Sequence, residues 1–199
     1  KMKQPDLENF VGIHNRKYCD GGQCIRLYKT FMKKKDPEAA NIVMGHNEED
    51  LLGLGTIFSL LAYKKLYDGE YHPKQCVILE QELKIVIELS AAAPVNVSCG
   101  NSDFYLSVNG YEARMLVHLK EGKLRQYYRN YKDYEFIPGE DTAMPKSITR
   151  YMDKSLKIAT TPQTCYTWFN CDEDFLNNEK KQMQYLTHTL PFFLDNLNK

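Results

Sequence analysis

Three segments in the middle of the chain alternate apolar and polar residues, and this pattern constrains the fold more than any other feature. Every second residue is apolar in ELKIVIEL (82–89), in DFYLSV (103–108) and in EARMLVHL (112–119). The dipeptide Asn109-Gly110, which separates the last two, is a strong signal for a hairpin turn. The alternation predicts an antiparallel meander over residues 76–137 with one buried face.

Helical patterns flank the meander on both sides. Asp36-Pro37 has the residue types of a helix start, and a second helix is expected to begin in the acidic run after His46. A final helix is predicted over residues 172–190, with Pro191 ending or kinking it. The order of elements predicts a single α+β domain over residues 1–199, helical over 1–71 and 141–199, with helices packed on the sheet.

The segment LRQYYRNYKDYEFI (124–137) fits two periodicities. Its tyrosines match helical spacing, but the segment continues the meander, so we expect a strand.

The cysteines point to disulfide bonds. Their number is even, two close pairs stand out (CDGGQC and CYTWFNC), and Asp-Gly-Gly in the first favours a tight reversal of the chain. Zinc is one alternative: the first pair just fits the spacing of zinc ligands, but the second does not, and no histidine is close to either pair. Six buried thiols are the other alternative. The sequence therefore predicts a disulfide-stapled fold in an oxidising compartment. The cysteines concerned are Cys19, Cys24, Cys76, Cys99, Cys165 and Cys171.

Two further expectations follow from this reading. If residues 77–89 and 97–108 form a hairpin, Cys76 and Cys99 lie too far apart to bond to each other. Asn96-Val97-Ser98 has the pattern of an N-glycosylation site, so Asn96 is expected to carry a glycan in a secretory pathway.

Charge and hydropathy argue against two classes of protein: those that bind nucleic acid through a basic surface and those that span a membrane. The chain has 26 Lys and Arg against 26 Asp and Glu, which argues against a general electrostatic grip on nucleic acid. Its longest apolar stretch, residues 51–63, is too short to span a membrane. We expect an extracellular, secreted protein whose signal peptide has been removed.

Motifs for catalysis, metal ions or cofactors are not recognisable in the sequence. The densest polar cluster, HNEED (46–50), could bind a cation, but acidic residues in such a run are more typical of a helix start. We therefore expect no catalytic residue, metal or cofactor.

The tyrosines provide the functional hypothesis. Tyrosine is enriched at recognition surfaces and lines ligand cavities, although it also has a high propensity for strands. The sequence predicts a secreted, non-enzymatic binding protein, with a secreted hydrolase as the alternative. Its partner would be an extracellular protein or a small amphipathic ligand, and the expected binding residues are Tyr127, Tyr128, Tyr131, Tyr134 and Arg129.

Overall fold

The computed structural model describes residues 2–14, 16–18 and 20–197. The chain divides into two compact units, residues 1–61 and 62–199. We call them the helical unit and the sheet unit and describe each by itself. The fold is α+β, with antiparallel sheets and with helices towards both ends of the chain.

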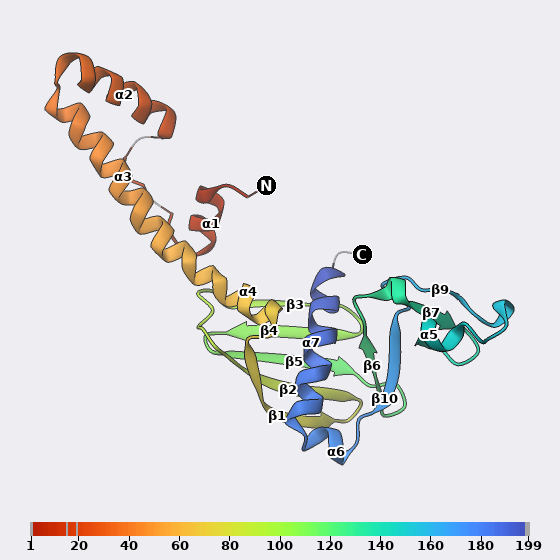
Figure 1. The fold of residues 1–199 in the computed structure, drawn as a ribbon. Helices are drawn as coiled ribbons and strands as arrows, with labels where there is room; N and C mark the ends of the chain where they lie inside the picture. Colours follow the sequence, from red (N-terminus) through yellow and green to blue (C-terminus); the bar gives the residue numbers. More distant parts are fainter. Residues whose placement is uncertain (1, 15, 19, 198–199) are drawn as a thin grey trace. The chain divides into compact units, whose positions relative to one another are not determined.

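The helical unit consists of α1 (Gln4–Phe10), α2 (Gly21–Lys34), α3 (Pro37–Ile57) and the short 3₁₀ helix η1 (Phe58–Leu60). Asp36 caps α3 as expected, since its side chain accepts a hydrogen bond from the Glu38 backbone N–H at 3.0 Å. The α2 and α3 helices form a hairpin (Figure 1).

Two local predictions in this unit were wrong. The run after His46 does not begin a helix, because α3 passes through it without a break. The Asp-Gly-Gly stretch does not reverse the chain tightly, because Asp20 accepts a hydrogen bond from the Gln23 N–H at 2.9 Å and thereby caps the start of α2.

A five-stranded antiparallel sheet is the centre of the sheet unit, with strand order β1-β2-β5-β4-β3. The helix α4 (Leu61–Asp68) precedes it. The five strands are β1 (Tyr71–Leu79), β2 (Glu82–Leu89), β3 (Val97–Gly100), β4 (Phe104–Asn109) and β5 (Glu112–His118). The predicted strand 77–89 is in fact two strands, because the chain turns at Glu80, where φ is +56°.

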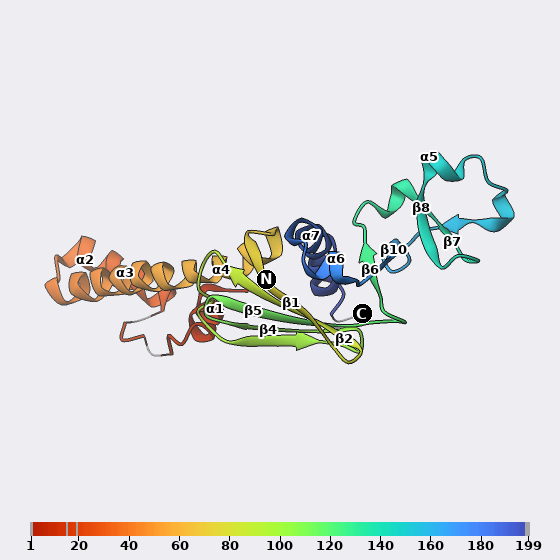
Figure 2. The same ribbon diagram turned by 90° about the horizontal axis from the view of Figure 1, so that it is seen from below.

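The alternating residues form the core as predicted. Leu83, Ile85 and Ile87 are fully buried in β2, and Met115 is fully buried in β5. Helix α7 (Glu179–Asp195) covers this face of the sheet (Figures 1 and 2). Its Phe193 ring stacks on Phe104 of β4 with 4.2 Å between the ring centroids.

Smaller strands complete the unit. β6 (Lys123–Tyr127) pairs with β10 (Tyr166–Asn170), and β7 (Tyr134–Ile137) lies between β8 (Thr142–Pro145) and β9 (Ile158–Ala159). The remaining short helices are η2 (Tyr131–Asp133), α5 (Lys146–Thr149), η3 (Lys154–Leu156) and α6 (Glu173–Leu176). The expected single strand over 124–137 is therefore interrupted by η2, and strands occur in the C-terminal region that was expected to be helical.

Pro191 lies inside α7 and does not end it. The residues beyond it are strongly packed, since Phe192 stacks on Tyr127 at 3.7 Å and Phe193 stacks on Phe104. Burial of these rings outweighs the backbone hydrogen bond that proline cannot donate.

The disulfide-stapled fold is contradicted. Cys76, Cys99, Cys165 and Cys171 carry free thiols, and Cys24 is buried on α2. Cys19 lies outside the described residues. Cys76 and Cys99 do lie apart, but for another reason than the one predicted: β1 and β3 are the two edge strands of the sheet. A core of this size does not depend on covalent links.

Candidate functional site

The predicted binding residues separate into three environments. Tyr127 is buried at the end of β6, where its ring stacks on Phe192. Tyr128 stacks on Tyr134 with 5.1 Å between centroids. Tyr131 is half-buried in η2. The tyrosines thus do not converge on one surface, although their role in binding stays a prediction.

Two other predicted site residues lie at the surface. The exposed guanidinium of Arg129 lies over the Tyr67 ring at 4.9 Å and forms an ion pair with Asp195 at 3.6 Å. Asn96 is exposed just before β3, and its glycosylation stays a prediction.

A pocket of about 250 Å³ lies where β5, β6, β10 and α7 meet in the sheet unit. Apolar side chains, among them Val117, Tyr127 and Phe193, form part of its lining. Charged and polar groups come from the strand ends and the turns beside them. The full lining is Asp103, Val117, His118, Lys120, Arg125, Tyr127, Trp168 and Phe193.

Cationic groups gather against aromatic rings at one wall of this pocket. Arg125 and Trp168 are paired in the β6–β10 ladder, and the guanidinium carbon lies 4.7 Å from the centroids of both Trp168 and Tyr166. The Lys120 ammonium lies 5.5 Å from the Trp168 centroid. Such contacts hold cations in place without neutralising their charge.

Arg125 keeps unused capacity to bind an anion. Within the described part of the chain, it has no ion pair with a carboxylate, and its buried Nε atom has no hydrogen-bond acceptor. Burial disfavours its charge, but the neighbouring oxygens of Tyr127 and Tyr166 and the carboxylate of Asp141 raise the pKa of Arg125 on balance. The guanidinium therefore stays charged with donors available.

Asp141 fixes the aromatic wall. Its backbone oxygen accepts a hydrogen bond from the Trp168 Nε1 at 2.9 Å, and its carboxylate accepts one from the Tyr166 hydroxyl at 2.5 Å. Burial and this carboxylate raise the pKa of Tyr166 to about 12, so the hydroxyl remains a donor at neutral pH. The wall is thus held in place before any ligand arrives.

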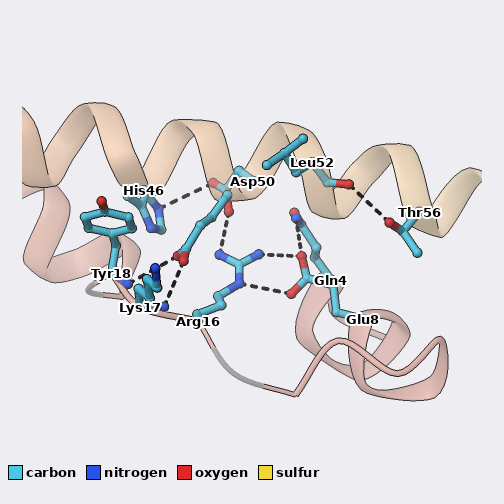
Figure 3. Close-up of polar contacts among 10 residues, drawn as sticks. Gln4, Glu8, Arg16, Lys17, Tyr18, His46, Asp50, Leu52 and Thr56 are labelled. Carbon is cyan, nitrogen blue, oxygen red and sulfur yellow. Dashed lines mark hydrogen bonds and ion pairs between the residues drawn. The ribbon is translucent and has the colours of Figure 1, made fainter.

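The helical unit contains a second polar cluster (Figure 3). Arg16 donates to Glu8 through Nε at 3.0 Å and to Asp50 through a terminal nitrogen at 2.5 Å. The Asp50 carboxylate also lies 3.4 Å from the His46 Nε2. Hydrogen bonding by Arg16 lowers the pKa of Glu8, which keeps this buried carboxylate ionised.

This cluster attaches the N-terminal segment to α3. Gly53 lets Glu8 approach, because a Cβ there would lie 2.3 Å from the Glu8 Oε1. Glu49, which the sequence offered as a possible cation ligand, instead accepts hydrogen bonds from the Lys17 and Tyr18 backbone N–H groups. Within the described ranges, no three His, Cys, Asp or Glu side chains are placed to hold a metal ion.

Sequence reasoning missed most of the pocket. Of the residues that line it, only Tyr127 was among the predicted binding residues. Trp168 is the only tryptophan of the chain, which was the one usable signal. The other residues meet only through the pairing of β6 with β10, which residue spacing does not reveal.

Comparison with known proteins gives one match. A family model described as RNase_H superfamily matches residues 2–62, less than a third of the chain. This is a similarity of one segment, and all elements of the segment that the structure describes are helical. None of the curated proteins matches the chain, and neither does any solved structure.

These findings overturn the predicted function. A secreted, disulfide-bonded glycoprotein that acts as a binding protein does not agree with the free thiols or with the RNase H-like match. Extracellular location and the kind of partner are untested and stay predictions. Among the described helices, none is long and apolar enough to cross a membrane.

Proposed function

We propose that the pocket of the sheet unit binds a nucleotide, as a phosphate joined to a planar base. The proposal depends on the position of Arg125. Its charged guanidinium is held against Trp168 and Tyr166, and no carboxylate of the described residues lies within ion-pair distance of it. Guanidinium groups bind phosphate through two parallel hydrogen bonds. Lys120 adds a second positive charge at the same wall.

The rest of the pocket suits the planar part of such a ligand. Val117, Tyr127 and Phe193, which are core residues, form the apolar part of its lining. Apolar lining with a few placed polar groups is the usual composition of small-molecule sites. The RNase H-like match directs the choice of ligand towards nucleotides, but the pocket lies outside the matched segment.

The charge of the chain favours a free nucleotide over a nucleic acid strand as the ligand. The binding of nucleic acid strands depends on many phosphate contacts along a basic surface, and the chain has no net charge. Arg125 and Lys120 lie in one pocket, and together they can bind one phosphate group, as in a single nucleotide.

The experiment measures binding by isothermal titration calorimetry. UMP and AMP are expected to bind at least about tenfold more tightly than uridine and adenosine, a difference of about 1.4 kcal/mol. Inorganic phosphate should compete. Single-stranded oligouridine should bind no more tightly per site than UMP.

Matched variants locate the site. Arg125→Met keeps the length of the side chain but removes its charge and should abolish the preference for nucleotide over nucleoside. Arg114→Met, on the exposed side of β5, should leave it unchanged. Equal affinity for nucleosides, or UMP binding by Arg125→Met at wild-type strength, contradicts the proposal.

The family match favours a second candidate, cleavage of RNA by the helical unit. Nucleases of the two-metal type hold their cations between clustered carboxylates. Here both Glu8 and Asp50 are bound by Arg16, and Glu49 binds backbone N–H groups. These residues do not fit a metal pair, so we assign no step of such a reaction to them.

A further inference from the structure

One carboxylate lies among the cationic and aromatic groups of the pocket in the sheet unit. It belongs to Asp103, the one acidic residue among the described residues that line the pocket. Asp103 immediately precedes β4, and its backbone oxygen accepts a hydrogen bond from the His118 N–H at 2.9 Å. Phosphate binding does not explain this carboxylate, because it would repel a phosphate group.

The backbone around Asp103 is held by Asn101. The side-chain oxygen of Asn101 accepts hydrogen bonds from the Asp103 and Phe104 N–H groups, at 2.9 and 3.2 Å. The Asn101 N–H in turn donates to the Phe104 backbone oxygen at 2.9 Å. Because none of these bonds uses the Asp103 carboxylate, the turn should keep its shape when that side chain is removed.

The Asp103 carboxylate remains available to a ligand. Within the part of the chain that the structure describes, it forms no ion pair and accepts no hydrogen bond. Burial raises the pKa of the nearby Tyr127 hydroxyl, hydrogen bonding and the charge of Arg125 lower it, and the charge of Asp103 raises it again. Asp103 and Arg125 thus both act on one hydroxyl of the pocket, yet they do not neutralise each other.

An ionised carboxylate only accepts hydrogen bonds, so Asp103 requires donors on the ligand. In UMP the donors are the two ribose hydroxyls and one N–H of the base. That N–H lies between two carbonyl oxygens, which would repel a carboxylate. The ribose is also joined directly to the phosphate, so a phosphate on Arg125 places the ribose close to the anchoring group.

Carboxylates accept hydrogen bonds from ribose hydroxyls in other nucleotide sites, where they select the sugar. We propose that Asp103 accepts hydrogen bonds from the ribose hydroxyls, so that the pocket binds ribonucleotides in preference to 2′-deoxyribonucleotides. This inference rests on the proposed binding of nucleotides, with Asp103 as a residue that determines specificity.

Isothermal titration calorimetry of the full chain with UMP and dUMP tests the inference. UMP should bind at least about fivefold more tightly than dUMP, because dUMP lacks one of the two hydroxyl donors. Asp103→Ala should reduce this ratio to less than about twofold. Inorganic phosphate should bind Asp103→Ala at least as tightly as wild type, since a negative charge has left the pocket. A variant with a damaged pocket would instead bind phosphate more weakly.

Glu112→Ala is the matched control. Glu112 lies at the other end of β5, six residues before His118 and therefore about 20 Å away, and its side chain is 45% exposed. This variant should keep the wild-type ratio of UMP to dUMP affinity. Far-UV circular dichroism checks that both variants are folded.

The outcomes separate this inference from the proposed function. If UMP binds no more tightly than uridine, nucleotide binding is wrong and the role of Asp103 falls with it. If UMP binds more tightly than uridine but no more tightly than dUMP, only the role of Asp103 is overturned. Tighter binding of CMP than of UMP in that case would assign the carboxylate to an amino group of the base. A ratio that Asp103→Ala leaves unchanged overturns the inference as well.

Discussion

Arg125 and Trp168 are directly opposite each other in the antiparallel pair of β6 and β10, with the guanidinium carbon 4.7 Å from the indole centroid. This register places a guanidinium and an aromatic ring at the same wall of the pocket. The geometry depends on Asp141, which binds the indole N–H of Trp168 and the hydroxyl of Tyr166. The pocket therefore has a support that can be tested separately from ligand binding.

Trp168→Phe keeps an aromatic ring but removes the hydrogen bond to Asp141. We expect a loss of about 1 kcal/mol in the free energy of unfolding, measured by urea denaturation. Tyr166→Phe removes the second bond to the same residue, so the two losses should not add in the double variant. Strict additivity would show that Asp141 does not couple the two rings.

Tyr127→Ala should destabilise the sheet unit by about 3–5 kcal/mol, because truncation of a buried aromatic ring leaves a cavity. The Tyr127 ring is 5% exposed and packs on Phe192, Phe193 and Tyr166. Tyr111, which is 64% exposed in the β4–β5 turn, is the control, and Tyr111→Ala should change stability by less than about 0.5 kcal/mol. Similar melting of the two variants would mean that Tyr127 is not a core residue.

The core could be predicted from the sequence, but the site could not. Alternation in β2, β4 and β5 is a local signal, and it identified Ile85 and Met115 as core residues. The strand order depends on the turn at Glu80, a residue type that does not favour positive φ, so this turn left no local signal.

The site and the end of α7 depend on distant contacts. Arg125 and Trp168 are brought together by the β6–β10 pairing, and Pro191 is tolerated because the rings next to it are buried. The spacing of residues along the chain predicts neither the β6–β10 pairing nor the burial of the rings beside Pro191. Cysteine count and pattern favoured disulfides, yet they did not distinguish bonded cysteines from buried thiols such as Cys165 and Cys171.

The Glu8–Arg16 pair should make the stability of the helical unit depend on pH. Arg16 lowers the pKa of Glu8, so the ionised carboxylate stabilises the fold above its unfolded pKa of about 4.3. This contribution falls as the pH drops through the lower pKa of the folded state. Hydrogen exchange of α1 should show wild type more protected than Glu8→Gln at pH 7, with the difference disappearing in acid. A difference that grows in acid would contradict the assignment.

The thiols of the sheet unit should be unreactive in the folded protein. Burial raises the pKa of Cys76 to about 12 and the pKa values of Cys165 and Cys171 to about 11, so at pH 8 almost no thiolate is present. Iodoacetamide followed by peptide mass spectrometry should label these residues only after unfolding in urea. Rapid labelling under native conditions, or a disulfide at any of them, would contradict the structure.

The most direct measurement of the central claim uses Trp168, because the only tryptophan of the chain lines the proposed nucleotide pocket. Its emission, excited at the red edge of indole absorption, is followed during titration with UMP and, separately, with uridine. We expect a saturable change with UMP, a change at least about tenfold weaker in apparent affinity with uridine, and no saturable change with UMP in Arg125→Met. A wild-type emission that UMP leaves unchanged, or that uridine changes at the same concentrations, would contradict the account.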